Sequence, residues 1–281
     1  MLLSDGWKDY AILDAGDGYK LERWGDITLL RPDPQAIWPM QQKRDVDATY
    51  IRSSSGGGHW EYARALPESW SVNYRGLKFI VRPTGFKHTG LFPEQAVNWD
   101  WMTSLVEGAP RPFKVLNLFA YTGGASVALA SAGAQVVHVD AAKGIVAWAR
   151  QNAEASGIDP GAVRYIVDDA MKFVLREGRR GNRYDGILMD PPSYGRGPTG
   201  EMWKLEKDLY PLVAECAKLL SRDARFFLIN SYTTGLAPSI LKNVLKTALP
   251  PGIVESDEVA LPIERDGLIL PCGATGRWMR G

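Results

Sequence analysis

The sequence is poor in the features that mark several classes of protein. It has only two cysteines, Cys216 and Cys272, which are too few for a disulfide framework or a four-cysteine zinc site. No stretch approaches the roughly 18 uninterrupted apolar residues of a membrane-spanning helix. The first residues also lack the basic start and apolar core of a secretory signal. We therefore expect a cytoplasmic protein with no metal centre and no membrane contact.

An excess of charge of either sign is also missing. The 281 residues include 33 Lys and Arg against 32 Asp and Glu, a formal net charge of +1. Proteins that bind nucleic acid mainly through its phosphates usually carry a clear basic excess. If this chain binds nucleic acid, its basic residues must act locally. Hydrophobic residues make up 45% of the chain, which is enough for the core of one large domain or two small ones.

The N-terminal part is rich in tryptophan and in turns. Seven of the ten tryptophans precede Pro110. Short β-rich runs at 27–30, 70–74 and 77–81 alternate with turn-forming residues, and the Ser/Gly tract 53–58 is typical of a loop. We expect residues 1–110 to form a small, mostly antiparallel β domain. Its tryptophans would line either an RNA cleft or the contact surface of a homodimer.

From residue 111 to residue 281, apolar strands alternate with helical stretches. Strands are predicted at 115–120, 135–139, 163–167, 184–189 and 225–229, with two more at 253–260 and at the C-terminal end. Helices are predicted at 125–132 and 142–156, and near 170–177, 203–220 and 238–248. This alternation predicts a parallel sheet with helices on both faces. The expected fold class is α/β, a doubly wound, mostly parallel, Rossmann-like sheet.

Polar residues follow three of the predicted strands, where ligands of such sheets bind. The first strand runs into Asn117-Leu-Phe-Ala-Tyr-Thr-Gly-Gly-Ala-Ser126, whose Gly123 and Gly124 allow a tight turn and close approach to a ligand. The second ends at Asp140, suited to accept hydrogen bonds from ribose hydroxyls. The third ends at Asp168-Asp169, placed for the amino edge of an adenine. Each alone is more often a turn or helix cap, but the three in strand order favour a nucleoside site.

The nucleoside is expected to carry no phosphate. The segment 121–126 does not fit the Gly-x-Gly-x-x-Gly pattern of dinucleotide folds, and no Gly-x-x-x-x-Gly-Lys-Ser/Thr phosphate loop occurs. These absences disfavour a nicotinamide cofactor and a nucleoside triphosphate. S-adenosylmethionine is therefore the predicted cofactor.

The fourth strand ends in Asp190-Pro-Pro-Ser-Tyr194. Pro191 and Pro192 restrict the backbone and remove two donors, leaving carbonyls to point into the crevice. Asp190 can then orient a ring or amino nitrogen, and Tyr194 offers a flat face on which a base can stack. The segment alone is equally explained by a strand stop with a surface tyrosine. Beside the other three strand ends, we interpret these four residues as catalytic.

These four segments together resemble the class I S-adenosylmethionine-dependent methyltransferases. More narrowly, the chain resembles the bacterial 23S rRNA base methyltransferases that modify cytosine C5 or guanine N7, over about residues 70–235. The resemblance implies an RNA partner. It also implies a set of cofactor-binding residues, which are Phe92, Gln95, Asn117, Phe119, Tyr121, Thr122, Gly123, Gly124, Asp140, Asp169 and Asp190.

The chain departs from this family at two points. Ala96 stands where relatives carry an arginine that binds the methionine carboxylate of the cofactor. In this chain we expect Lys87 or backbone amides near Gly123 to bind that carboxylate. Relatives that methylate a pyrimidine carbon keep a cysteine after the fifth strand, and 229–235 has none. We expect Cys216 to pack in the core and Cys272 to lie away from the crevice. The predicted acceptor is thus a ring or exocyclic nitrogen of a ribosomal RNA base, with no covalent cysteine intermediate.

Local basic residues are the expected RNA contacts. Residues 69–93 contain four of them and no acid, and four arginines follow in the second half; the eight are Arg75, Lys78, Arg82, Lys87, Arg179, Arg180, Arg183 and Arg196. A solvated surface explains each one equally well when taken singly.

Two alternatives stay open, a methyltransferase of a small molecule or protein and an adenosyl-binding protein without catalysis. Asp190 and its two prolines argue against the second.

Overall fold

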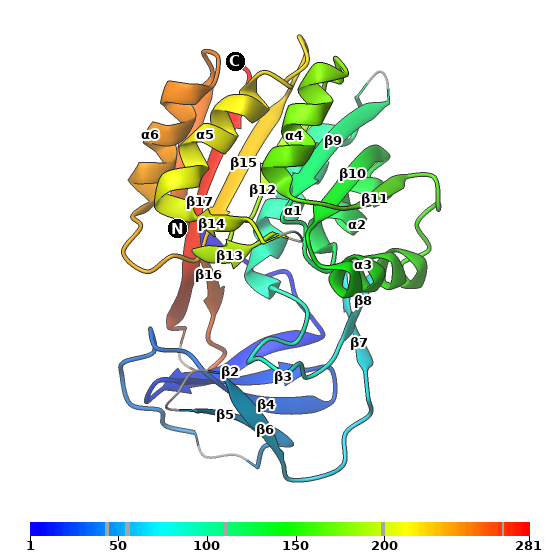
Figure 1. Ribbon diagram of the computed structural model, residues 1–281. Coiled ribbons are helices and arrows are strands. Elements are labelled where there is room, and N and C mark those ends of the chain that lie inside the picture. The colour runs from blue at the N-terminus through cyan, green and yellow to red at the C-terminus, as the bar shows by residue number, and fades with distance from the viewer. Residues whose placement is uncertain (43–44, 54–56, 110–111, 198–199, 266) are drawn as a thin grey trace. The chain divides into compact units, whose positions relative to one another are not determined.

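The computed structural model describes residues 1–42, 45–53, 57–109, 112–197, 200–265 and 267–281 (Figure 1). The chain divides into two compact units. The parallel-sheet unit comprises residues 98–259 and 273–281 with Met1, and the N-terminal unit comprises 2–97 and 260–272. The domain boundary expected at 110/111 lies outside the described residues and stays a prediction. Residues 54–56 of the Ser/Gly tract 53–58 also lie outside them.

The largest sheet in the described part of the chain has eight strands, in the order β1-β16-β17-β15-β12-β9-β10-β11. Their bounds are β1 (Leu2–Leu3), β9 (Phe113–Leu118), β10 (Ala134–Asp140), β11 (Val163–Val167), β12 (Gly186–Met189), β15 (Phe226–Ser231), β16 (Ile253–Pro262) and β17 (Ile269–Met279). Neighbouring strands from β15 to β11 pair in parallel, whereas β17 pairs antiparallel with β15. The predicted α/β class and mostly parallel sheet are confirmed.

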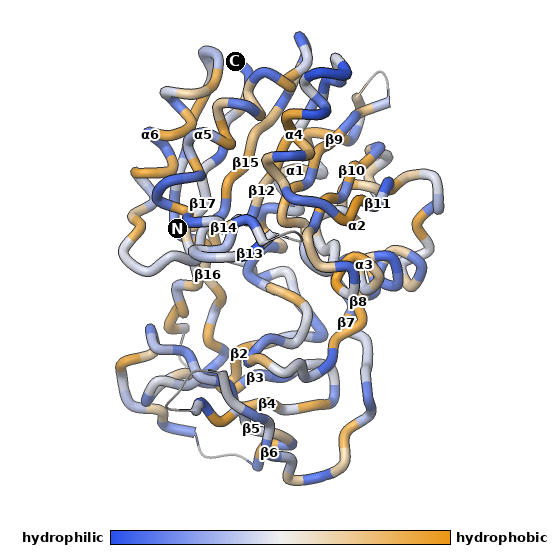
Figure 2. Tube along the Cα trace, in the orientation of Figure 1, coloured by the Kyte–Doolittle hydropathy of each residue, from blue (hydrophilic) through white to orange (hydrophobic). Residues whose placement is uncertain are grey.

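Helices cover this sheet on both faces. They are α1 (Ala96–Val106), α2 (Gly124–Ser131), α3 (Lys143–Ala155), α4 (Ala170–Arg179), α5 (Leu205–Ala217) and α6 (Pro238–Ala248). Alternate residues such as Leu116 and Ile187 share one core with Phe173 of α4 and Leu212 of α5. On the other face, the ring of Phe226 lies 5.8 Å from that of Trp101 in α1. Because the central strands are buried on both faces, they are mainly apolar, as Figure 2 shows for β12 and β15.

The order of the strands reverses at β9. The chain passes from β9 to β10 and β11 on one side, and then returns to place β12 on the other side of β9. In sheets of this kind, the loops that follow two such strands diverge to opposite sides, and ligands bind beyond the carboxyl ends of these strands. The sequence-predicted nucleoside residues follow these same strands.

The N-terminal unit contains a five-stranded sheet in its described residues, in the order β2-β3-β4-β5-β6. The strands are β2 (Tyr10–Gly16), β3 (Tyr19–Trp24), β4 (Ile27–Pro32), β5 (Ala48–Arg52) and β6 (Gly58–Tyr62). The expected antiparallel pairing holds except between β4 and β5, which pair in parallel. A separate hairpin joins β7 (Trp70–Tyr74) to β8 (Leu77–Val81) through Arg75 and Gly76, both at positive φ, as a two-residue turn requires.

A buried ion pair lies in this five-stranded sheet. Arg31 donates from Nε and Nη2 to the two carboxylate oxygens of Glu22, over 2.5 and 2.7 Å, and the Tyr10 hydroxyl donates to Glu22 over 2.7 Å. Glu22 is fully buried, yet the charges of Arg31 and Lys20 lower its carboxyl pKa to about 2 against the opposing effect of burial. The pair thus stays charged in the folded protein at neutral pH.

No helix within the described residues is both long enough and apolar enough to cross a membrane.

Candidate active site at the carboxyl edge of the parallel sheet

Main-chain hydrogen bonds connect the ends of four neighbouring strands. Just beyond β9 and β10, the Ala120 amide donates to the Val139 carbonyl over 3.0 Å. The Asp168 amide after β11 donates to the carbonyl of Asp140 over 3.1 Å, and the Asp190 amide after β12 donates to that of Leu118 over 3.3 Å. Segments spread over 70 residues of sequence therefore meet at one edge of the sheet.

The loop after β9 has an unusual backbone. Phe119 and Tyr121 adopt positive φ angles of 52° and 50°, which non-glycine residues rarely do, and Gly123 has a φ of 85°. Such conformations cost about 1–3 kcal/mol each and persist only where their surroundings hold them. Asp140 helps to hold this loop conformation, because its Oδ2 accepts a hydrogen bond from the Tyr121 amide over 2.9 Å. Its Oδ1 accepts from the Ala142 amide over 3.0 Å.

Asp140 is also suited to bind a polar ligand. Burial raises the pKa of its carboxyl above the ordinary value, while the amides of Ala142, Tyr121 and Ala141 act in the opposite direction. An ionised carboxylate has about four lone-pair positions, more than the three backbone amides of Tyr121, Ala141 and Ala142 occupy. A ligand with hydroxyl donors would stabilise this partly desolvated carboxylate.

A buried network of polar side chains lies next to the loop after β9. Asn117 Nδ2 donates to Ser126 Oγ over 2.9 Å, and Ser126 Oγ lies 3.0 Å from Nδ1 of His138. Burial lowers the pKa of His138 to about 3, so its imidazole is neutral in the folded protein at pH 7. The Thr122 carbonyl accepts from Asn152 Nδ2 over 2.8 Å. The side chains of Asn117 and Thr122 are buried, so we expect any part they take in binding to act through the loop.

Gly123 and Gly124 make the tight turn that the sequence predicts, but protein groups occupy the space beside them. A Cβ at Gly123 would lie 2.9 Å from the Cβ of Ala149 in α3. A Cβ at Gly124 would lie 2.6 Å from Cζ2 of Trp99 in α1. Packing against two helices therefore requires both glycines, and their close approach to a ligand stays a prediction. No sequence signal singled out Trp99, His138 or Ser126.

Asp168 and Asp169 have structural partners at the start of α4. Asp169 is the N-cap residue, whose Oδ1 accepts from the Lys172 amide over 2.9 Å. Asp168 forms an ion pair with Arg176. The helix-cap interpretation therefore applies to Asp169, although its second oxygen faces Gly197, where a Cβ would lie 3.2 Å away. Its contact with adenine stays a prediction.

The loop after β12 leads into a short hairpin of β13 (Tyr194–Arg196) and β14 (Met202–Lys204). The Pro192 carbonyl, expected to point into the crevice, instead accepts from Trp203 Nε1 over 2.6 Å. The Trp203 ring lies 5.0 Å from that of Phe119, so this tryptophan, missed by the sequence analysis, connects the β12 loop to the β9 loop. Pro191 is buried and Tyr194 is 54% exposed, which leaves the tyrosine ring accessible for stacking.

Other predicted residues belong to the N-terminal unit. Phe92 precedes a short 3-10 helix (Pro93–Gln95) that contains Gln95, and both residues keep their cofactor role as predictions. Burial lowers the pKa of the Lys87 ammonium, whose Nζ lies 3.4 Å from the Pro32 carbonyl. That Lys87 binds the methionine carboxylate in place of the arginine that relatives carry at the position of Ala96 likewise stays a prediction.

The two cysteines are poor nucleophiles. Cys216 belongs to α5 and is fully buried in the core, as the sequence analysis expects. Cys272 belongs to the N-terminal unit. Burial raises the pKa of both thiols, so neither supplies a thiolate at neutral pH. Within the part of the chain that the structure describes, no three His, Cys, Asp or Glu residues are grouped to hold a metal ion.

Comparison with known proteins identifies relatives of this chain. It matches the S-adenosylmethionine-dependent methyltransferase family over residues 28–235. It is 30% identical over 211 residues to the ribosomal RNA large subunit methyltransferase K/L of Shewanella frigidimarina, covering 74% of this chain and 28% of the relative. It is 33% identical over 120 residues to the ribosomal RNA large subunit methyltransferase I of Aeromonas hydrophila, covering 42% of this chain and 29% of the relative. The chain thus spans less than a third of the length of these two relatives.

A solved structure resembles the whole chain. The S-adenosylmethionine-dependent methyltransferase from Agrobacterium tumefaciens is 38% identical and superposes with a TM-score of 0.95, covering 100% of this chain and 93% of that one. The predicted family, enzyme class and cofactor are therefore confirmed. This chain belongs to the S-adenosylmethionine-dependent methyltransferases and is distantly related to the bacterial 23S rRNA methyltransferases.

Proposed function

We propose that this enzyme methylates a ring or exocyclic nitrogen of a ribosomal RNA base, in the cytoplasm and without a covalent cysteine intermediate. The observation that carries the proposal is the contrast between Asp190 and the cysteines. Asp190 directly follows β12, and its amide bonds to Leu118 at the end of β9, whereas both thiols have a raised pKa. Methylation of a pyrimidine carbon needs a thiolate that adds to the ring, but a nitrogen acceptor already has a lone pair.

The chemistry at the β9 and β10 ends fits the cofactor. S-adenosylmethionine, when bound, supplies a methyl group already activated on a positively charged sulfonium. Asp140 would hold the two ribose hydroxyls, because its buried carboxylate gains from hydroxyl donors. Oδ2 of Asp169 would accept from the adenine amino group. Phe119 and Tyr121, held at positive φ, would shape the loop that receives the ligand.

The loop after β12 would position the acceptor. Asp190 would accept a hydrogen bond from the base and so direct the nitrogen lone pair, while Pro191 and Pro192 keep the loop rigid. Tyr194 would stack on the base. Alignment of reacting groups contributes about 7–11 kcal/mol, more than the roughly 3–5 kcal/mol of acid–base assistance. We therefore give these residues a positioning role at the reacting base.

RNA is favoured as substrate by the relatives and by local charge. Both relatives are described as ribosomal RNA large subunit methyltransferases. The β7–β8 hairpin exposes Arg75 and Lys78 within the acid-free stretch 69–93. A methyltransferase of a small molecule or protein is the second candidate, and the net charge of +1 favours it.

The test uses S-adenosylmethionine labelled on its methyl group and ribosomal RNA from cells that lack the gene. We expect label at one RNA base in wild-type protein and its loss in Asp190→Ala, with cofactor binding by calorimetry retained. Glu206→Ala, an exposed acid on α5, is the control and should behave as wild type. Label in protein but not in RNA would support the second candidate. Full activity of Asp190→Ala would contradict the role given to Asp190.

A further inference from the structure

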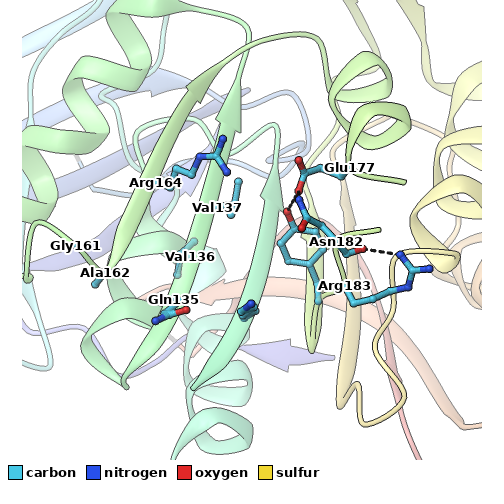
Figure 3. Close-up of a pocket in the computed structure, with 11 residues that line it drawn as sticks. Gln135, Val136, Val137, Gly161, Ala162, Arg164, Glu177, Asn182 and Arg183 are labelled. Carbon is cyan, nitrogen blue, oxygen red and sulfur yellow. Dashed lines mark hydrogen bonds between the residues drawn. The ribbon is translucent and has the colours of Figure 1, made fainter. Parts of the chain in front are cut away.

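We propose that the parallel-sheet unit has a second binding site, for a phosphate group, at the amino edge of its sheet. A cavity of about 300 Å³ opens there between the starts of β9, β10 and β11 and the end of α4 (Figure 3). The active-site residues lie at the other end of the same strands. The cavity is lined by Gln135, Val136 and Val137 of β10, three to five residues before Asp140, so at about 3.3 Å per residue the two sites are separated by roughly 10–17 Å.

Three cationic side chains from different elements line the cavity. Lys114 comes from β9, Arg164 from β11, and Arg183 from the loop before β12. All three are exposed, and none forms an ion pair with a carboxylate among the described residues. Arg183 donates from Nη1 to the Asn182 carbonyl over 2.8 Å, as the dashed line in Figure 3 marks. Three cations that line one cavity, with no carboxylate ion-paired to any of them among the described residues, favour an anionic ligand.

Glu177 lines the same cavity but does not cancel this charge. It is only 1% exposed, and its Oε2 accepts from Asn182 Nδ2 over 2.7 Å and from the Tyr184 hydroxyl over 2.6 Å. Its Oε1 lies 3.3 Å from Nη1 of Arg180, which balances its charge. Burial and the nearby Glu177 raise the pKa of Tyr184, so the phenol stays neutral and remains a donor. Glu177 is therefore part of the wall, and the charge left for a ligand is positive.

Phosphate is the anion that suits this arrangement. Guanidinium groups present several donors in one plane and bind phosphate oxygens in pairs, while lysine adds a point charge. The cations stand at the solvent-exposed mouth, so a phosphate that belongs to a longer molecule can enter while the rest stays outside. The source is either the backbone of a polynucleotide or a free phosphate. The site itself does not depend on which atom the enzyme methylates.

The experiment compares charge reversal in the cavity with the same reversal elsewhere. Lys114→Glu combined with Arg164→Glu removes two of the cations. Lys242→Glu combined with Lys246→Glu makes the same change in charge on α6, which packs against β17 at the other end of the sheet. The two probes are inorganic phosphate, measured by calorimetry, and a twelve-nucleotide single-stranded RNA, measured by fluorescence anisotropy. Calorimetry with S-adenosylmethionine checks that each variant is folded.

We expect the cavity variant to lose at least tenfold in phosphate affinity, and the α6 variant to match wild type. If the source is a polynucleotide, the cavity variant also loses RNA affinity. The slope of the logarithm of its RNA-binding constant against the logarithm of the salt concentration then decreases in magnitude by about 1.4, for two lost phosphate contacts. An unchanged RNA affinity with weakened phosphate binding identifies a free phosphate. Equal binding of both probes by all three proteins, or equal loss in both variants, would overturn the proposal. Should the glutamate pair fail to fold, Lys114→Gln with Arg164→Gln decides the same question.

Discussion

The contact between Gly124 and Trp99 allows a sharp test of how the cofactor loop is packed. A Cβ at position 124 would lie 2.6, 3.1 and 3.3 Å from Cζ2, Cη2 and Cε2 of the indole. Real Cβ atoms do not approach carbon at 2.6 Å, and Trp99 is 4% exposed, so the ring has little room to retreat. We expect Gly124→Ala to destabilise the protein by about 1–3 kcal/mol, the usual cost of one added methyl in a packed core.

The companion change is Trp99→Phe, which removes the six-membered part of the indole that the new methyl would meet. Alone, it should cost about 1–3 kcal/mol through lost burial and an imperfectly filled cavity. In the double variant the methyl occupies part of that space, and alanine has a helix propensity up to about 1 kcal/mol better than glycine at the start of α2. We therefore expect the double variant to be at least about 1 kcal/mol more stable than the sum of the single effects predicts.

Urea unfolding followed by far-ultraviolet circular dichroism measures this cycle without relying on tryptophan emission. Gly144→Ala in α3 is the matched control, because a Cβ there meets nothing within 4 Å. It should be neutral or stabilising by up to about 1 kcal/mol. Strict additivity of the two changes, or a neutral Gly124→Ala, would refute the packing described here.

Three further predictions concern buried charge and the cofactor loop. Glu22→Gln leaves Arg31 without its carboxylate and should cost about 3–5 kcal/mol in urea unfolding. Because the folded pKa of Glu22 is about 2 and the unfolded value is 4.5, stability present above pH 4.5 is lost as pH falls toward 2, by about 3 kcal/mol, and this loss should vanish in the variant. His138→Phe deprives Ser126 of its hydrogen-bond partner and should cost about 1–3 kcal/mol at pH 7. The His138 pKa is lowered from 6.5 to about 3, so in wild type the unfolded chain takes up the proton first and stability falls as pH drops below 6.5; a variant with the same slope would contradict this. Asp140→Asn should weaken S-adenosylmethionine binding at least tenfold by calorimetry, and an unchanged Kd would exclude Asp140 from the cofactor site.

Local patterns were sufficient to predict most elements of the parallel-sheet unit and one hairpin of the N-terminal unit. The observed bounds of β11 and α6 match the predicted 163–167 and 238–248, and the β7–β8 hairpin matches 70–74 and 77–81. These segments are short apolar strands or amphipathic helices bounded by turn residues, so their local preference agrees with the fold. Helix α1 was missed because its sequence, with two tryptophans, two valines, an asparagine and a threonine, has low intrinsic helix propensity. Tertiary contacts hold it, such as the bond from Asn98 Nδ2 to Asn230 Oδ1 over 3.0 Å.

The hydrogen-bond partners of the polar residues at the strand ends could not be predicted from the sequence. Asp140 was predicted to face a ribose, but its bond to the Tyr121 amide 19 residues away could not be foreseen. Likewise, the Pro192 carbonyl was expected to point into the crevice, but it accepts a hydrogen bond from Trp203 Nε1. Hydrogen-bond partners distant in sequence depend on where side chains meet after folding, and nothing in the local pattern encodes that meeting.

The order of strand-end motifs along the chain was enough to determine the fold class, the family and the cofactor, because a parallel sheet brings the residues after successive strands to one edge. Only the tertiary structure decided which of those residues also have partners within the protein, such as Asp140 with the Tyr121 amide and Asp169 with the Lys172 amide. It also placed Lys114, Arg164 and Arg183 around one cavity at the opposite edge, since these cations come from three separate elements and no spacing in the sequence relates them.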